Sequence, residues 1–63
     1  MNSITIRIFK PVDVKRAYKR MNAHGFTISS REFVEVLFEN EGQDFIRIGP
    51  WVFRFSPNFW EEW

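Results

Sequence analysis

Four basic residues stand close together between positions 15 and 20 of this 63-residue chain. Lys15 and Lys19 are four residues apart, as are Arg16 and Arg20, so in a helix each pair projects from one side. Like charges at this spacing mildly destabilise a helix. A face that accepts this cost is suited to binding phosphates or an acidic protein surface. An ordinary solvated face would have the same composition, and both interpretations stay open.

Few other residues offer catalytic or metal-binding chemistry. The chain has no cysteine and one histidine, His24, which excludes the usual zinc sites. We interpret His24 as a capping residue, because a cation is favoured near a helix C-terminus. Glu61 and Glu62 are adjacent and suit neither a catalytic dyad nor a metal site, and the isolated glycines form no phosphate-binding loop. We therefore expect no enzymatic activity, no cofactor and no metal.

Charge is divided unevenly along the chain. Residues 1–31 contain seven basic residues and one acidic residue, a net charge of +6, whereas residues 32–63 contain two basic and seven acidic residues, a net charge of −5. Such asymmetry can indicate an anionic partner for the basic half. It is equally consistent with attraction between the two halves.

The length predicts a single domain, residues 1–63, with a marginal core, because a chain of this size buries only about 60% of its unfolded surface. Without disulfides, the twelve aromatic residues supply much of the buried area. Self-association as a homodimer would supply more. No apolar run is long enough for a membrane span, and no signal-peptide pattern is present. We expect a cytoplasmic protein without a membrane partner.

Two elements near the N-terminus are predicted by periodicity. Apolar and polar residues alternate over residues 3–8, which is typical of a half-buried strand. Its polar side comprises Ser3, Thr5 and Arg7. A helix is expected over about residues 11–24, starting at Pro11 and closed by Gly25. Its apolar stripe comprises Val14, Ala17, Tyr18 and Met21.

Residues 29–40 allow two interpretations. Ser29 and Glu32 have the spacing of a capping box, which favours a helix. The segment "FVEVLFE" is rich in valine and phenylalanine, which favour a strand. A turn at "NEGQ" would pair this strand with the next one and place Glu35 opposite Arg47. Because this pairing aligns the apolar residues of three strands on one face, with Arg47 and Arg54 on the other, we prefer the strand.

The preferred fold is therefore an α+β domain of β-α-β-β-β order. One helix, about residues 11–24, packs on an antiparallel sheet. The strands of this sheet are 3–8, 32–39, 44–49 and 51–55. A short helical turn follows at the C-terminus, where Ser56 or Asn58 is expected to provide the cap.

The aromatic C-terminus, "SPNFWEEW", has two explanations. Phe59 and Trp63 are four residues apart and Trp60 and Trp63 three, so they cluster on one side of a helical turn. The turn can fold back as a lid on a small core, which we prefer. Alternatively, Trp60 and Trp63 anchor a partner or a second subunit.

Residues 3–40 resemble the ribbon-helix-helix repressors. The resemblance rests on the strand "ITIRI", the helix that follows it and the segment "HGFTISSREFVEVLFEN". In that family, the N-terminal strand pairs with its twin in a dimer and enters the DNA major groove. The resemblance implies a helix at residues 29–40 and a DNA contact surface. That surface would comprise Ser3, Thr5, Arg7, Lys10, Ser29 and Ser30. A winged helix-turn-helix with residues 44–55 as the wing is a related alternative.

The preferred functional hypothesis is a small non-catalytic regulator or inhibitor, of a style often carried by phages and mobile elements. It would bind a macromolecular partner, either an acidic protein surface or nucleic acid. The expected partner-binding residues are Lys15, Arg16, Lys19, Arg20, Trp60 and Trp63. The alternative is the dimeric DNA-binding repressor implied by the resemblance.

Overall fold

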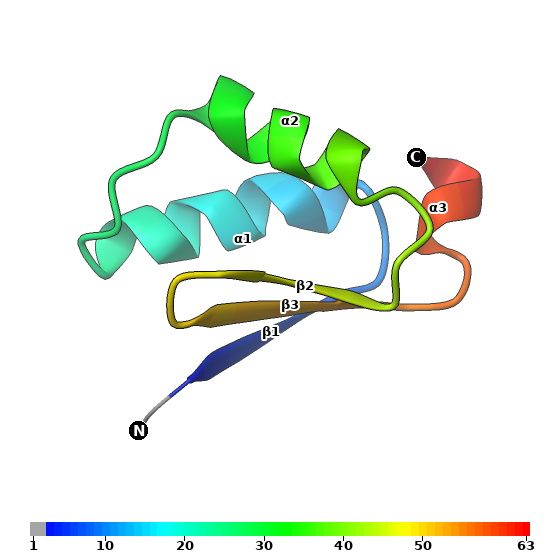
Figure 1. The fold of residues 1–63 in the computed structure, drawn as a ribbon, viewed down its shortest axis with the longest axis horizontal. Helices are drawn as coiled ribbons and strands as arrows, with labels where there is room; N and C mark the ends of the chain where they lie inside the picture. Colours follow the sequence, from blue (N-terminus) through cyan, green and yellow to red (C-terminus); the bar gives the residue numbers. More distant parts are fainter. Residues whose placement is uncertain (1–2) are drawn as a thin grey trace.

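The computed structural model describes residues 3–63, which form a three-stranded sheet covered by helices on one face (Figure 1). The elements are β1 (Ile4–Ile8), α1 (Val12–Ala23), α2 (Ser30–Glu39), β2 (Phe45–Ile48), β3 (Trp51–Phe55) and α3 (Phe59–Glu62). This arrangement confirms the expectation of a small α+β domain. Within the described residues, no helix is long and apolar enough to cross a membrane.

The sheet is mixed, not antiparallel as predicted. Its strand order is β1-β3-β2, with β1 parallel and β2 antiparallel to β3. Parallel neighbours require a crossover connection of a dozen or more residues. Here α1, α2 and β2 lie between the two parallel strands in the chain. The parallel pairing of β1 with β3 was missed because it joins strands far apart in the sequence and has no local signal such as a hairpin turn.

The predicted strand at residues 32–39 is wrong, because these residues belong to α2. The capping box is complete: Ser29 Oγ accepts the N–H of Glu32 at 3.1 Å, and Glu32 Oε1 accepts the N–H of Ser29 at 3.2 Å. Phe33 and Leu37 are four residues apart and both are buried. Capping and this apolar spacing outweigh the strand preference of valine and phenylalanine, which depends strongly on context.

The alternative in which residues 29–40 are helical is confirmed for this segment. Asn40 ends α2, where its Nδ2 donates to the carbonyl of Val36 at 2.8 Å. Gly42 then adopts a φ of 90°, in the left-handed region that favours glycine. The turn predicted at "NEGQ" therefore forms, but it joins a helix to a strand.

The remaining predictions of secondary structure agree with the structure. The hairpin of β2 and β3 turns its apolar side toward the helices, where Ile46 and Phe53 are opposite each other and buried. On α1, Val14, Ala17 and Met21 are buried and Tyr18 is half-buried. The core thus lies between the sheet and its two long helices.

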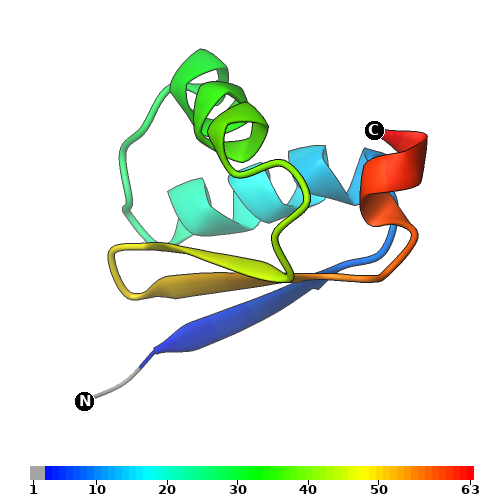
Figure 2. The ribbon, with the colours of Figure 1, turned by 45° about the vertical axis from the view of Figure 1, so that its right-hand side comes forward.

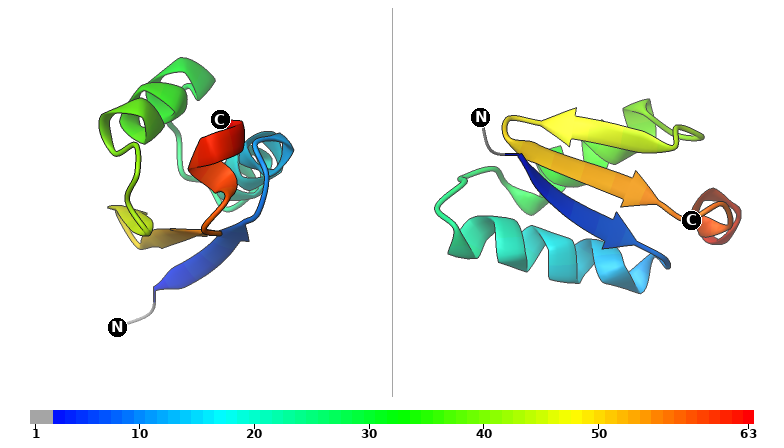
Figure 3. Two further views of the ribbon diagram at one scale, coloured as in Figure 1. Left: turned by 90° about the vertical axis from the view of Figure 1, so that its right-hand side faces the viewer. Right: turned by 90° about the horizontal axis from the view of Figure 1, so that it is seen from below.

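The short helix α3 stands at the end of the sheet, beside the first turn of α1 (Figure 2). Viewed from that end, it lies between α1 and α2 (Figure 3, left). Its first residue, Phe59, is fully buried, with its ring 4.8 Å from that of Phe55. The C-terminal segment therefore closes an end of the core that the two long helices leave open.

Candidate functional site

The four cations of α1 are all exposed, but they form two stripes instead of one face. Successive helical residues are rotated by about 100°, so Lys15 and Lys19 project to one side and Arg16 and Arg20 to another. Lys15 lines a groove between α1 and α2, whereas Arg16 and Arg20 line a groove between α1 and β1. The arginine pair and the lysine pair therefore face different surroundings.

Asp13 is the acidic residue nearest to these cations, and it serves mainly to begin the helix. Its Oδ2 accepts the N–H groups of Phe9 at 3.2 Å and Lys10 at 3.0 Å. Its Oδ1 lies 3.7 Å from Nη1 of Arg16, whose side chain is 84% exposed. The Asp13 side chain is 19% exposed, but the long separation and the solvated Arg16 make this pair a small contribution to stability. Within residues 3–63, no other ion pair occurs, so no direct ion pair joins the basic and acidic halves.

The groove between α1 and β1 brings together two sets of residues that the sequence analysis assigned to different hypotheses. Arg7 from β1 faces it together with Arg16 and Arg20 from α1. The groove has a volume of about 380 Å³. Its remaining lining comprises Thr5, Ile6, Phe9, Asp13 and Ala17. Seen from below the sheet, α1 runs alongside β1, which accounts for this meeting (Figure 3, right).

The face of the sheet turned away from the helices, here called the open face, carries further arginines. Its side chains form two rows across the three strands. In the first row, Phe45, Arg54 and Arg7 are neighbours in register. The second row comprises Arg47, Val52 and Thr5.

Arg47 and Arg54 were not among the predicted site residues. The predicted ion pair of Glu35 with Arg47 is wrong, because Glu35 lies on α2. Arg47 Nε instead donates to the carbonyl of Gly49 at 3.4 Å. Apolar and polar residues alternate in "FIRI" and "WVFRF". This alternation already placed both arginines on the face opposite the apolar one, and it could have identified them as surface candidates.

The exposed carboxylates lie mainly on the other side of the molecule. Helices α2 and α3 carry Glu32, Glu35, Glu39, Glu61 and Glu62, all exposed. In Figure 1, α2 is the element farthest from the open face. Two further exposed carboxylates, Glu41 and Asp44, lie in the loop that leads into β2, so the charge division along the chain is only in part a division between two sides of the fold.

The residues implied by the ribbon-helix-helix resemblance are not brought together. Ser3, Thr5 and Arg7 are exposed and lie at or beside β1, with Lys10 following in the turn before α1. Ser29 and Ser30 lie at the start of α2, on the helical side of the sheet. In addition, β1 is hydrogen-bonded to β3 of its own chain, so only its outer edge is left for a second copy.

Trp60 and Trp63 pack against the core, as the preferred lid interpretation requires. Trp60 Nε1 donates to the carbonyl of Gln43 at 2.8 Å. The ring of Trp63 meets that of Phe38 edge to face at 5.3 Å. The predicted caps are absent: Asn58 makes no side-chain cap, and Ser56 Oγ donates to the carbonyl of Phe9 at 2.9 Å. A role for the two tryptophans in partner binding stays a prediction.

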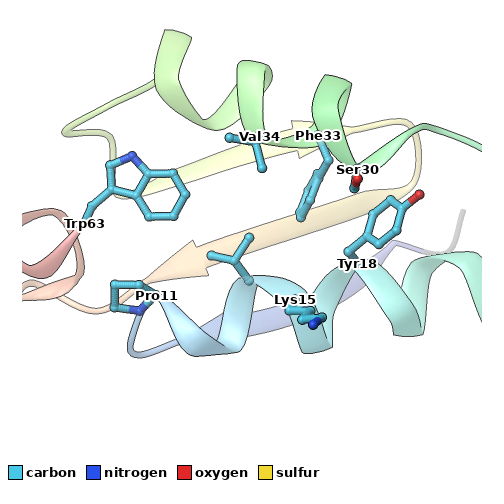
Figure 4. A pocket seen from close by; sticks show the side chains of 8 residues that line it. Pro11, Lys15, Tyr18, Ser30, Phe33, Val34 and Trp63 are labelled. Carbon is cyan, nitrogen blue, oxygen red and sulfur yellow. The ribbon is translucent and has the colours of Figure 1, made fainter.

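The groove between α1 and α2 is mostly apolar and has a volume of about 360 Å³ (Figure 4). The Trp63 ring closes one end of it, and the rings of Tyr18 and Phe33 lie at the other. Its lining includes no carboxylate or imidazole, and the Tyr18 hydroxyl donates to the carbonyl of Ile28 at 2.7 Å. Within residues 3–63, no cluster of three or more His, Asp and Glu residues is placed to hold a metal ion.

Comparisons with protein-family models, curated proteins and solved structures found no match to this chain. A function must therefore be inferred from the exposed residues and their geometry.

Proposed function

We propose that the protein is a small non-catalytic regulator that binds nucleic acid through its basic surface. The centre of this surface is the groove between α1 and β1, with Arg7, Arg16 and Arg20. The open-face arginines Arg47 and Arg54 flank it on the sheet, and Lys15 and Lys19 lie on another side of α1. The main support for the proposal is that Arg7, Arg16 and Arg20 line the same groove. Cations from two elements thus form a surface instead of a single helical stripe.

The chemistry of arginine supports phosphate as the ligand. A guanidinium group presents a planar fork of donors that matches two phosphate oxygens. A nucleic acid strand carries phosphates at regular intervals, so one strand can contact several of these cations at once. Exposed carboxylates, which would repel it, are concentrated on α2 and α3. An acidic protein surface is the competing partner, and binding measurements separate the two.

The proposal is tested by comparing the affinity for labelled DNA at about 50 mM and 200 mM salt. Binding through phosphates gives a logarithmic salt slope of about −0.9 per contact on duplex DNA. The double substitution Arg16→Gln with Arg20→Gln should remove two contacts and make the slope less negative by about 1.8. Arg31→Gln on α2 is the control, because it also removes an exposed positive charge.

If Arg31→Gln and a single Arg20→Gln weaken DNA binding equally, net charge and not the groove determines the affinity. Failure to bind any DNA, together with salt-sensitive binding to polyglutamate, would replace nucleic acid with an acidic protein as the partner. Trp60 and Trp63 are not needed as anchors in this proposal, because their packing against the core accounts for their positions.

A dimeric repressor of the ribbon-helix-helix kind is a second candidate. The helical state of residues 29–40 and the exposure of Thr5 and Arg7 favour it. It requires β1 to pair with its twin through the outer edge. Arg7→Ala should then abolish a sequence-specific shift of duplex DNA, and sedimentation should detect a dimer. A monomer that binds DNA without sequence preference would exclude this candidate.

A further inference from the structure

The open face combines exposed arginines with an exposed aromatic ring. Phe45 is 53% exposed although it belongs to a strand. The guanidinium carbon of Arg54 lies 5.9 Å from the centre of the Phe45 ring. Arg7 follows Arg54 in the same row across the sheet. None of the six side chains of this face is acidic.

A second exposed aromatic lies next to this row. Phe9 is 59% exposed and directly follows β1. It lines a shallow pocket together with Arg7 and Arg54, so the row of cations has an aromatic ring near each end. Within residues 3–63, no helix or other strand covers the open face of the sheet, so neither ring is packed into the core (Figure 3, right).

We infer that the open face binds single-stranded nucleic acid, with a base stacked on Phe45 and phosphates contacted by Arg7, Arg47 and Arg54. The inference rests on the proposed function for the class of partner and adds that the strand must be unpaired. Only unpaired bases present their flat faces to a protein side chain. Proteins bind single strands through aromatic rings, on which bases stack, and through cations, which contact the phosphates. Each stacked base contributes roughly a tenfold change in affinity.

Charge complementarity favours this occupant over a second copy of the chain. Two open faces packed against each other would bring three arginines of one copy against three of the other, with no acidic side chain from either face between them. A polyanion neutralises the same arginines. An extended strand is also preferred to a duplex, because stacked and paired bases would leave Phe45 without a partner.

The experiment measures fluorescence anisotropy of a labelled oligothymidylate of about 15 nucleotides, and of a duplex of the same length, with the full chain. Phe45→Leu keeps an apolar side chain but removes the ring. It should weaken single-strand binding roughly tenfold without changing the salt slope. Arg54→Gln should make that slope less negative by about 0.7.

Two substitutions on α2 serve as matched controls. Phe38→Leu changes a ring that is 56% exposed, similar to Phe45, and Arg31→Gln removes an exposed cation. Both should leave single-strand affinity within about twofold, a surface-substitution effect. Circular dichroism melts confirm that each variant is folded, so a loss of binding by Phe45→Leu or Arg54→Gln is a property of the open face.

The outcomes separate this inference from the proposed function. Unchanged binding by both Phe45→Leu and Arg54→Gln, with loss in the Arg16→Gln and Arg20→Gln variant, would overturn the open-face inference. Nucleic-acid binding through the groove between α1 and β1 would then still stand. Preference for the duplex over the single strand would do the same. Absence of binding to either DNA would overturn both. Single-strand preference lost in Phe45→Leu and kept in Phe38→Leu supports the inference.

Discussion

The substitution Phe59→Ala tests whether the C-terminal segment is part of the core. Phe59 is 0% exposed, and the nearest rings, those of Phe55 and Trp60, both have centroids 4.8 Å away. Truncating a buried phenylalanine to alanine typically costs about 3–5 kcal/mol, because the transfer free energy is lost and a cavity remains. A domain of this size is stable by about 3–9 kcal/mol in total. The substitution should therefore remove about a third or more of the free energy of unfolding.

Urea denaturation, followed by tryptophan fluorescence and circular dichroism, measures this loss. With a slope of about 1 kcal/mol per molar urea, the midpoint should fall by about 3 M or more, or the cooperative transition should disappear. Phe9→Ala is the control, because that ring is 59% exposed. It should change the free energy of unfolding by only about 0.5 kcal/mol.

A loss of less than about 1 kcal/mol in Phe59→Ala would refute the lid interpretation, because it is well below the cost of a core cavity. Deletion of residues 59–63 provides a second measurement. We expect the shortened chain to be unfolded. A shortened chain that is folded but no longer captures its partner would instead identify the aromatic C-terminus as an anchor.

Three further predictions concern stability. Ser29→Ala removes the cap of α2 and should cost about 1 kcal/mol in urea denaturation; no change would mean that the capping box is not needed to hold the helix. Tyr18→Phe removes the 2.7 Å hydrogen bond to Ile28 and should cost about 0.5–1.5 kcal/mol; a midpoint equal to that of the natural chain would show that water replaces this bond at no cost. Gly49→Ala places a Cβ 3.1 Å from the Phe26 ring at a φ of 58° and should lower stability by about 1 kcal/mol or more; a raised melting temperature would contradict this.

Local patterns in the sequence were sufficient for several elements. The alternation of residues 3–8, the stripe of α1 and the hairpin of β2 and β3 each depend on neighbouring residues alone. The state of residues 30–39 was harder, because a capping box and strand-forming residues gave opposite indications. The assumed hairpin decided the prediction wrongly, although Ser29 and Glu32 contained the correct signal.

The candidate site was likewise predictable only in part. Residue types and spacing alone identify the basic residues and show that Lys15 and Lys19, like Arg16 and Arg20, share a side of a helix. The packing of the elements was needed to place Arg7 beside the α1 arginines and opposite Arg54. The two cases differ because periodicity reports only on contacts within one element. The parallel pairing of β1 with β3 joins segments more than forty residues apart, and it depends on how the helices between them pack.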